Sequence, residues 1–310
     1  MVAGCHQVIG FEESAPRSQV GGDAGLADAD TIDGSAGQGG SGGTGAIGGA
    51  AGQGGSGGTG AIGGAAGFAG TCTDEAGPKT VEVPGGGVPV TMHATEVTRC
   101  QYAAFLATTP TQTVQTALCD WNVDFAPDAV CAAQTGDGPD AADLPQACVD
   151  WCDAAQYCAS LAMRLCGAKS GGPSSEPDMD DATVDQYFDV CSSFGAHNYP
   201  YGGDPSVSTS DGFEEHACNG FDHGVNATLP VGSLSTCQSS VAGYEGVFDL
   251  SGNVAEWEDL CSQEGATRRE DHCLVRGGGY GDNYAKQRCM DFSVVRRDER
   301  LSDLGFRCCD

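Results

Sequence analysis

Three oxygen-bearing side chains in the stretch 246–259, GVFDLSGNVAEWED, have the types and spacing to hold a metal ion. They are Asp249, Asn253 and Glu256. The Ser-Gly-Asn sequence at 251–253 predicts a sharp turn between them. A turn places backbone carbonyls and carboxylates on one concave side, and Ca²⁺ prefers such oxygen ligands. The alternative is a plain turn capped by Asn253, with Glu256 in solvent.

The overall charge restricts the classes of partner. The chain has 310 residues and a formal net charge of −29. A nucleic-acid-binding protein needs a basic surface, so this class is excluded. An acidic surface keeps a protein soluble and can collect divalent cations.

The cysteines indicate the compartment. The chain has 17 of them, without the pair of C-x-x-C motifs that would indicate a metal cluster. Disulfides persist in oxidising surroundings, so this content predicts an extracytoplasmic protein. If Cys5 is set aside, sixteen remain, which allows up to eight bridges.

The N-terminal part reads as a tether. Val-Ala-Gly-Cys at 2–5 matches the end of a bacterial lipoprotein signal, with Cys5 as the lipidated residue, although the charged and apolar regions of a signal are absent. The alternative is a free cysteine in a disordered tail. Residues 1–35 are expected to be disordered, and 36–70 contain AGQGGSGGTGAIGGA twice, a flexible Gly-rich linker. The globular domain is expected over 71–310.

Local patterns within 71–310 predict strands and helices. Alternating residues favour strands at 80–83 and 88–95. Capping boxes at 98–101 and 183–186 predict two helix starts, and Asp150 is a plausible N-cap between them.

The segment DLSGNVAEW at 249–257 resembles the D-M-S-G-N-V-W-E-W signature of the formylglycine-generating enzyme, or sulfatase-modifying factor, family, with Ala255 in place of a Trp. Further resemblances follow in the family's order: HATEVTRCQYAAFL, CVDWCDAAQYCASLAMRLC, the 183–191 helix, YPYG, LPVGS, LVRGGGY and LGFRCC. They cover about 75–310. The resemblance implies an irregular, loop-rich α+β domain, related to the C-type lectin fold, with several disulfides.

Enzymes of this family oxidise a substrate cysteine to formylglycine with copper(I). Two cysteines shortly after a G-G-S-W turn hold the copper, and soft thiolates suit this ion. Here the turn reads GGGY at 277–280, so Gly279 replaces the Ser. Residues 281–285 contain no cysteine, and the spacing of Cys289 matches a structural half-cystine of the family. The sequence therefore predicts that copper and the oxidase activity are lost.

The resemblance also implies calcium ligands. Asp249 and Glu256 would supply side-chain oxygens, and Gly252 and Val254 would supply carbonyls. A second site is less complete. It would use Asn219 and Gly220, with Asp222 as a third ligand, and a plain turn is the equal alternative there.

The same resemblance implies two disulfides, Cys191–Cys289 and Cys158–Cys308. Short spacing suggests two more, Cys261–Cys273 and Cys218–Cys237. Neighbouring cysteines do not bridge each other easily, so Cys309 is expected to have a partner other than Cys308.

The expected function is a surface binding module for a protein or glycan ligand, with contact to the membrane only through a lipid anchor. This expectation rests on fold analogy. Two rivals are an active oxidoreductase that uses another cysteine pair and a purely structural surface protein. Iron-dependent and hydrolytic chemistry are disfavoured, because the sequence has no H-x-x-x-H spacing and no G-x-S-x-G elbow outside the Gly-rich repeat.

Overall fold

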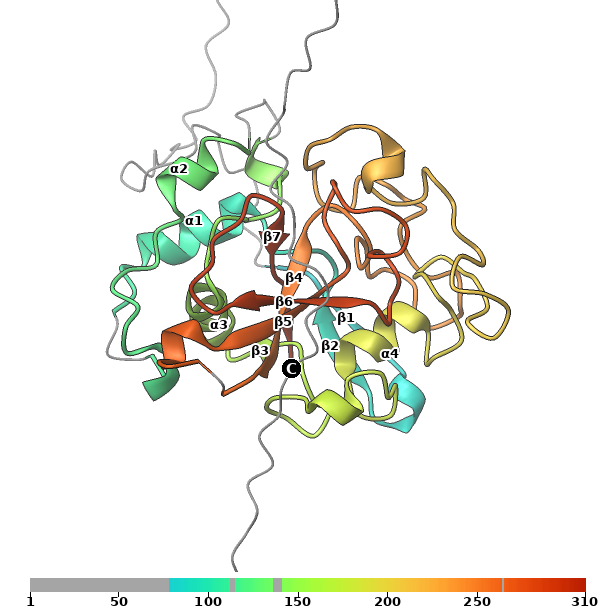
Figure 1. The fold of residues 1–310 in the computed structure, drawn as a ribbon, viewed down its shortest axis with the longest axis horizontal. Coiled ribbons are helices and arrows are strands. Elements are labelled where there is room, and N and C mark those ends of the chain that lie inside the picture. Colours follow the sequence, from blue (N-terminus) through green and yellow to red (C-terminus); the bar gives the residue numbers. More distant parts are fainter. Residues whose placement is uncertain (1–77, 112–114, 136–140, 264) are drawn as a thin grey trace, which may run out of the picture. The chain divides into compact units, whose positions relative to one another are not determined.

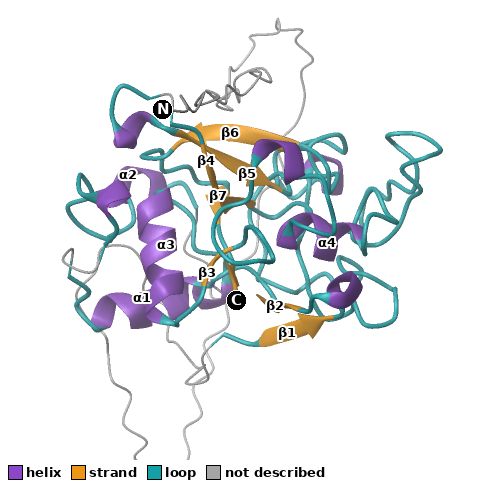
Figure 2. Ribbon diagram, turned by 90° about the horizontal axis from the view of Figure 1, so that it is seen from below, coloured by secondary structure: helices purple, strands orange, loops and turns teal. Residues whose placement is uncertain are grey.

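The computed structural model describes residues 78–111, 115–135, 141–263 and 265–310. The predicted lipidation site, the disordered segment and the Gly-rich linker lie outside the described residues. The described chain forms two small four-stranded sheets and a few short helices, joined by long loops (Figures 1 and 2).

The first sheet contains both ends of the described chain. Its strand order is β1 (Thr80–Val83), β2 (Val90–His93), β8 (Cys308–Cys309) and β3 (Arg164–Leu165), and neighbouring strands are antiparallel. β1 has the predicted bounds. β2 is shorter than the predicted 88–95, because the 3-10 turn at Gly85–Gly87 leads into Val88 and Pro89 has no N–H to donate.

The second sheet carries the segment that contains the predicted metal ligands. Its order is β6 (Phe292–Arg296), β5 (His272–Arg276), β4 (Ala255–Cys261) and β7 (Leu304–Gly305). β4 and β7 are parallel, and the other neighbours are antiparallel. β4 begins at Ala255, shortly after the turn at 251–253. The hydrogen bonds of the sheet therefore hold the chain on the C-terminal side of that turn.

Two helix starts were predicted correctly. α1 (Arg99–Ala107) has a capping box between Thr98 and Gln101, and α3 (Trp151–Ser160) has Asp150 as its N-cap. α2 (Ala129–Ala132) is a single turn. α1, α2 and α3 lie on one side of the molecule and α4 lies on the other (Figure 2).

The predicted capping box at 183–186 is wrong. α4 (Gln186–Ser192) begins after Asp185, whose side chain accepts a hydrogen bond from the N–H of Phe188. The Thr183 hydroxyl instead donates to Asp181, and the Gln186 side chain accepts from the N–H of Gly167. A carboxylate two residues further on therefore caps this helix in place of the threonine.

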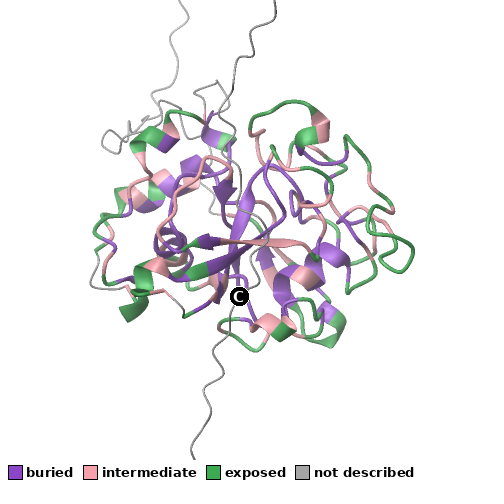
Figure 3. Cartoon of the chain, viewed as in Figure 1, coloured by how far each residue is buried: buried purple, intermediate pink, exposed green. Residues whose placement is uncertain are grey.

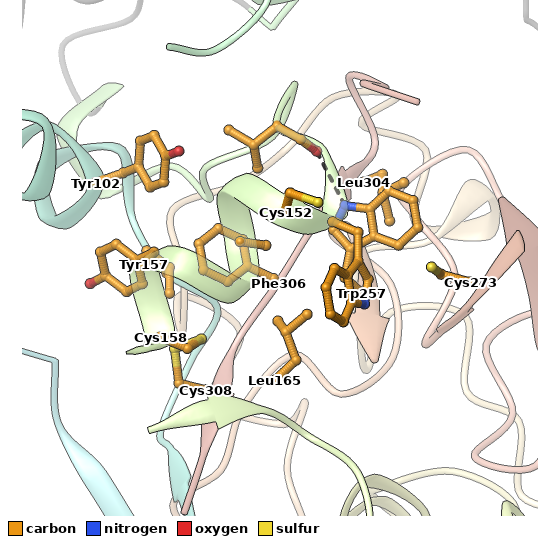
Figure 4. Packing of buried hydrophobic residues seen from close by; sticks show 14 of the residues in the cluster. Tyr102, Cys152, Tyr157, Cys158, Leu165, Trp257, Cys273, Leu304, Phe306 and Cys308 are labelled. Carbon is orange, nitrogen blue, oxygen red and sulfur yellow. Dashed lines mark hydrogen bonds between the residues drawn. A yellow bond between two sulfur atoms is a disulfide. The ribbon is translucent and has the colours of Figure 1, made fainter. Parts of the chain in front are cut away.

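The main core lies between α1, α3 and the second sheet. Aromatic rings pack there edge-to-face, with 5.4 Å between the centroids of Tyr157 and Phe306 and 6.1 Å between those of Tyr102 and Phe306 (Figure 4). The indole N–H of Trp257 donates to the carbonyl of Val149 at 3.1 Å. The strands and α3 are largely buried, and the loops range from buried to exposed (Figure 3). Each fully buried large apolar side chain contributes about 1.5–3 kcal/mol.

Seven disulfides cross-link the described chain. The four pairs named above are among them, and the other three are Cys119–Cys152, Cys131–Cys148 and Cys166–Cys309. Cys309 thus has a partner other than Cys308. The prediction of an irregular, loop-rich α+β domain with several disulfides is confirmed.

Candidate functional site

The turn at 251–253 joins two loops that are far away in sequence. The N–H of Asn253 donates to the carbonyl of Asn219 at 2.7 Å, and the N–H of Gly252 donates to the carbonyl of Gly277 at 2.8 Å. Gly252 has a φ of +75°, and a Cβ there would lie 2.5 Å from the carbonyl oxygen of Asn219. Only glycine fits this position. The two predicted calcium-ligand segments and the GGGY turn therefore meet at one place.

Glu256 does not lie in solvent. Its two carboxylate oxygens accept from Nε and Nη2 of Arg307, at 2.6 and 2.7 Å, and both residues are 1% exposed. Arg307 also donates to the carbonyls of His93 and Phe248. Burial lowers the pKa of a guanidinium, but the Glu256 carboxylate outweighs this effect and raises the pKa of Arg307. The result is a buried, bidentate ion pair between β4 and the chain's end.

Two further carboxyl groups, those of Asp249 and Glu96, lie beside this ion pair. Asp249 accepts from the N–H of Gly232 at 2.5 Å, and Glu96 accepts from the amide of Asn253 at 3.0 Å. Burial, followed by the charges of Asp249 and Glu256, holds the pKa of Glu96 well above its usual range. Burial also raises the pKa of Asp249. The second oxygen of Glu96, Oε2, is buried and has no hydrogen-bond partner in the described chain.

Sequence analysis did not identify Glu96 or Arg307 as members of this site. Both lie in segments already matched to the family, HATEVTRCQYAAFL and LGFRCC. The signal that was not used is their charge. A basic and an acidic residue in otherwise buried segments must find partners.

Replacing Glu96 by glutamine should stabilise the protein at neutral pH. Below about pH 4 a buried acid with a raised pKa is neutral in both the folded and the unfolded protein, and its protonation does not reduce the free energy of unfolding. As pH rises toward the folded pKa, the unfolded state loses its proton first, and the free energy of unfolding decreases. Gln copies the protonated acid and keeps the bond to Asn253. In the presence of a chelator, we expect E96Q to melt about 2–4 °C above the parent at pH 7.5, which is about 1 kcal/mol, and to match it near pH 4.

The matched control for E96Q is Glu82→Gln on β1, where the side chain is exposed. Its melting temperature should follow the parent at both pH values. An E96Q protein that is less stable than the parent at pH 7.5 would show that the ionised form of Glu96 is needed.

The second predicted calcium set has unsatisfied oxygens. Asn219 donates to the carbonyl of Ala227 and to Oδ1 of Asn253, but its own Oδ1 has no hydrogen-bond partner in the described chain. Oδ2 of Asp222 is likewise buried without a partner. Buried acceptors without donors are costly, and a cation would relieve them. The second set therefore fits calcium on this observation.

The first predicted calcium set fits less well, because both oxygens of Glu256 are engaged by Arg307. Within the described ranges, no group of three or more His, Cys, Asp or Glu side chains is arranged to hold a metal. A cation here would thus depend on amide and carbonyl oxygens as well as carboxylates.

The GGGY turn is closely packed by its neighbours. A Cβ on Gly277 would lie 2.6 Å from the hydroxyl of Tyr187, and a Cβ on Gly279 would lie 2.9 Å from Cβ of Asp303. A serine at 279, as in the family's turn, would therefore clash with Asp303. The departure from the family pattern has a local steric reason.

Among the residues that the structure describes, no free thiol lies near this turn. All fifteen cysteines of the described residues are in disulfides, and Cys289, the next sulfur after the turn, is bonded to Cys191. The side chains beyond the turn are aromatic and polar. Tyr284 lies against Phe213, with 5.5 Å between ring centroids, and its carbonyl accepts from the hydroxyl of Tyr199.

Comparison with known families decides the relationship. The model of the sulfatase-modifying factor enzyme 1-like domain matches residues 56–310. The chain belongs to this family. A comparison with curated proteins gives no match.

Three solved structures each align with 71% of this sulfatase-modifying factor-family chain. They are CarF (19% identity, 85% of that chain, TM-score 0.45), PvdO from Pseudomonas aeruginosa (21%, 80%, 0.46) and Treponema denticola variable protein 1 (17%, 84%, 0.41).

Proposed function

We propose that this protein is an extracytoplasmic member of the sulfatase-modifying factor family that does not oxidise cysteine and serves as a binding module. The observation that carries the proposal is the state of its cysteines. All those in the described chain are bonded to one another or to a further cysteine, and none is left at the GGGY turn to hold copper(I). Seven disulfides also indicate an oxidising compartment.

The loss of copper chemistry is tested by titration and turnover. The full chain is titrated with copper(I) in competition with a chromogenic chelator, and then incubated in air with a cysteine-containing peptide. We expect no stoichiometric copper complex and no change in the mass of the peptide. Tight copper binding together with conversion of the peptide cysteine would establish the rival reading, an active oxidoreductase with another cysteine pair.

A lipid anchor on Cys5 completes the proposed localisation. The short Val-Ala-Gly-Cys match and the Gly-rich linker after it support an anchor followed by a flexible tether. Among the described residues, no helix is both long and apolar enough to span a bilayer. Mass spectrometry of the membrane fraction from a bacterial host that processes lipoproteins would detect the lipid on Cys5.

Structural calcium is the second part of the proposal. Asn219 and Asp222, with the carbonyl of Gly220, would hold one ion. A second ion at Asp249, with carbonyls of Gly252 and Val254, would require Glu256 to release Arg307, so the proposal depends on the first set. Calcium would supply positive charge to oxygens that the fold buries. It is proposed as a structural ion that fixes the loops beside the GGGY turn.

Calcium added after chelation should raise the melting temperature of the wild-type protein. Asn219→Ala should abolish that response, because it removes the unpaired Oδ1. The readout is the calcium-dependent shift, since the substitution also removes the bonds to Ala227 and Asn253. Asn283→Ala, an exposed asparagine on a neighbouring turn, should respond like wild type. If calcium does not change the melting of the wild-type protein, the ion is wrongly assigned.

A further inference from the structure

A cleft of about 540 Å³ lies away from the GGGY turn, beside the start of α3. Its lining comes from five segments: the loop after Cys119, the N-caps of α2 and α3, the 3-10 turn at Arg268–Glu270 and the loop after β6. The residues used here are Trp121, Asp124, Asp128, Arg269, Asp298 and Arg300. Its volume is within the range of small-ligand sites, about 300–1,000 Å³.

Covalent and polar contacts hold the lining residues of the cleft in place. The Cys119–Cys152 disulfide ties the Trp121 loop to α3, and the indole N–H of Trp121 donates to the carbonyl of Leu118. Arg300 also lines the cleft, and its Nη2 lies 2.7 Å from Asp150 and 3.0 Å from Asp153. The shape is therefore present without a ligand.

Donors and acceptors stand side by side next to an aromatic ring. Nε of Arg269 donates to Oδ2 of Asp298 at 2.6 Å, and the guanidinium lies 5.7 Å from the ring centre of Trp121. In the described chain the Nη groups of Arg269 have no hydrogen-bond partner. Oδ1 of Asp298 is also buried without a partner, on a side chain that is only 8% exposed. The fold thus leaves an unused donor pair on Arg269 and an unused acceptor on Asp298, whose Oδ2 also accepts from Arg296 at 2.9 Å.

Asp124 and Asp128 add further acceptors. One oxygen of each accepts backbone N–H groups, of Ala126 in the first case and of Val130 and Cys131 in the second. The other oxygen of each has no partner within the described segments. Burying any of these groups under an apolar ligand would be costly, so the ligand must be polar.

We infer that this cleft binds a neutral saccharide. A sugar hydroxyl both donates and accepts, so neighbouring hydroxyls can take the Nη groups of Arg269 and the free oxygen of Asp298 together. The C–H surface of the ring can pack on the indole of Trp121. This inference rests on the proposed binding function and gives it a place and a ligand class.

A cationic ligand, such as a lysine-rich peptide, fits less well. The four lining aspartates would attract it, but it would lie beside the guanidinium groups of both Arg269 and Arg300. It would also leave the donors of Arg269 unused. The arginines of the cleft partly neutralise its aspartates, which suits a neutral ligand with many hydroxyl groups.

The protein carries its own probe for this site. Of its three tryptophans, Trp151 and Trp257 are 6% and 1% exposed, so Trp121 is the one at the surface. Acrylamide should quench mainly Trp121. We expect at least one member of a panel of cellohexaose, chitohexaose and mannohexaose, at millimolar concentration, to protect the full chain from quenching, whereas hexalysine should not.

Three variants locate the effect by calorimetric titration with the protecting sugar. Trp121→Ala should weaken binding by at least about tenfold, as expected for loss of a central aromatic contact, and Trp121→Phe by less. Asp298→Asn should also weaken it, with melting curves to show that the variant is folded. Phe221→Ala, an exposed aromatic at a 3-10 turn elsewhere, should bind like wild type.

Three results would overturn the assignment. They are no protection by any sugar of the panel, protection by hexalysine alone, or binding that Phe221→Ala removes and Trp121→Ala leaves intact. None of these results would change the copper titration, so failure of the saccharide site and failure of the proposed loss of oxidation can be told apart.

Discussion

Replacing Glu256 by alanine should lower the free energy of unfolding by about 3–5 kcal/mol at pH 7, because it leaves the buried guanidinium of Arg307 without its counter-ion. The pair is bidentate and almost fully buried, so water cannot replace the lost carboxylate. For a domain whose total stability is about 5–15 kcal/mol, the loss should be visible as a large decrease in the urea midpoint.

Two further variants interpret the Glu256→Ala result. Glu82→Ala, on an exposed position of β1, should change stability little. The double variant Glu256→Leu with Arg307→Met should recover much of the loss, because it removes both charges together. A cost below about 1 kcal/mol for Glu256→Ala would show that Arg307 is compensated by another carboxylate, with Glu96 the first candidate.

Removing the two disulfides at the C-terminus should cost more together than the sum of the separate losses. Cys158–Cys308 and Cys166–Cys309 span 150 and 143 residues and end on neighbouring residues. While one remains, removing the other opens only a ring of about ten residues, which costs about 3 kcal/mol in the chain-entropy estimate. Removing both releases a larger loop as well, which Cys191–Cys289 shortens to about 50 residues, for a total of about 7 kcal/mol.

Urea unfolding of serine variants measures this coupling. Removal of Cys131–Cys148, which closes a separate loop of 17 residues, should cost about 3 kcal/mol and should add to either single removal. If the stability losses from removing the two C-terminal bridges are also simply additive, then closure of the shared loop is not what stabilises this end of the chain.

The elements that could be predicted from sequence depend on short-range chemistry. The capping box at 98–101 and the Asp150 N-cap need only residues within one turn, and both are present in the structure. The predicted start of α4 was wrong because Asp185, within the same four residues, caps the helix in place of Thr183. A local pattern cannot decide between two adjacent caps when the packing of the helix makes the choice.

The site required information that the local sequence does not hold. Glu256 and Arg307 are separated by 51 residues, and Glu96 and Asn253 by 157. The saccharide cleft draws on five segments, none of which has a distinctive motif. The calcium ligands stay a prediction. The steric reason for Gly279 became visible only when Asp303 was found beside it.

The most direct test is to count free thiols in the native full-length protein. The chain is produced in an oxidising compartment, denatured without reductant, alkylated and weighed by mass spectrometry. We predict at most one modified cysteine per molecule, because all fifteen cysteines of the described residues are in disulfides and Cys5 is the one set aside from the expected pairs. Two or more modified cysteines that map beside the GGGY turn would contradict the account.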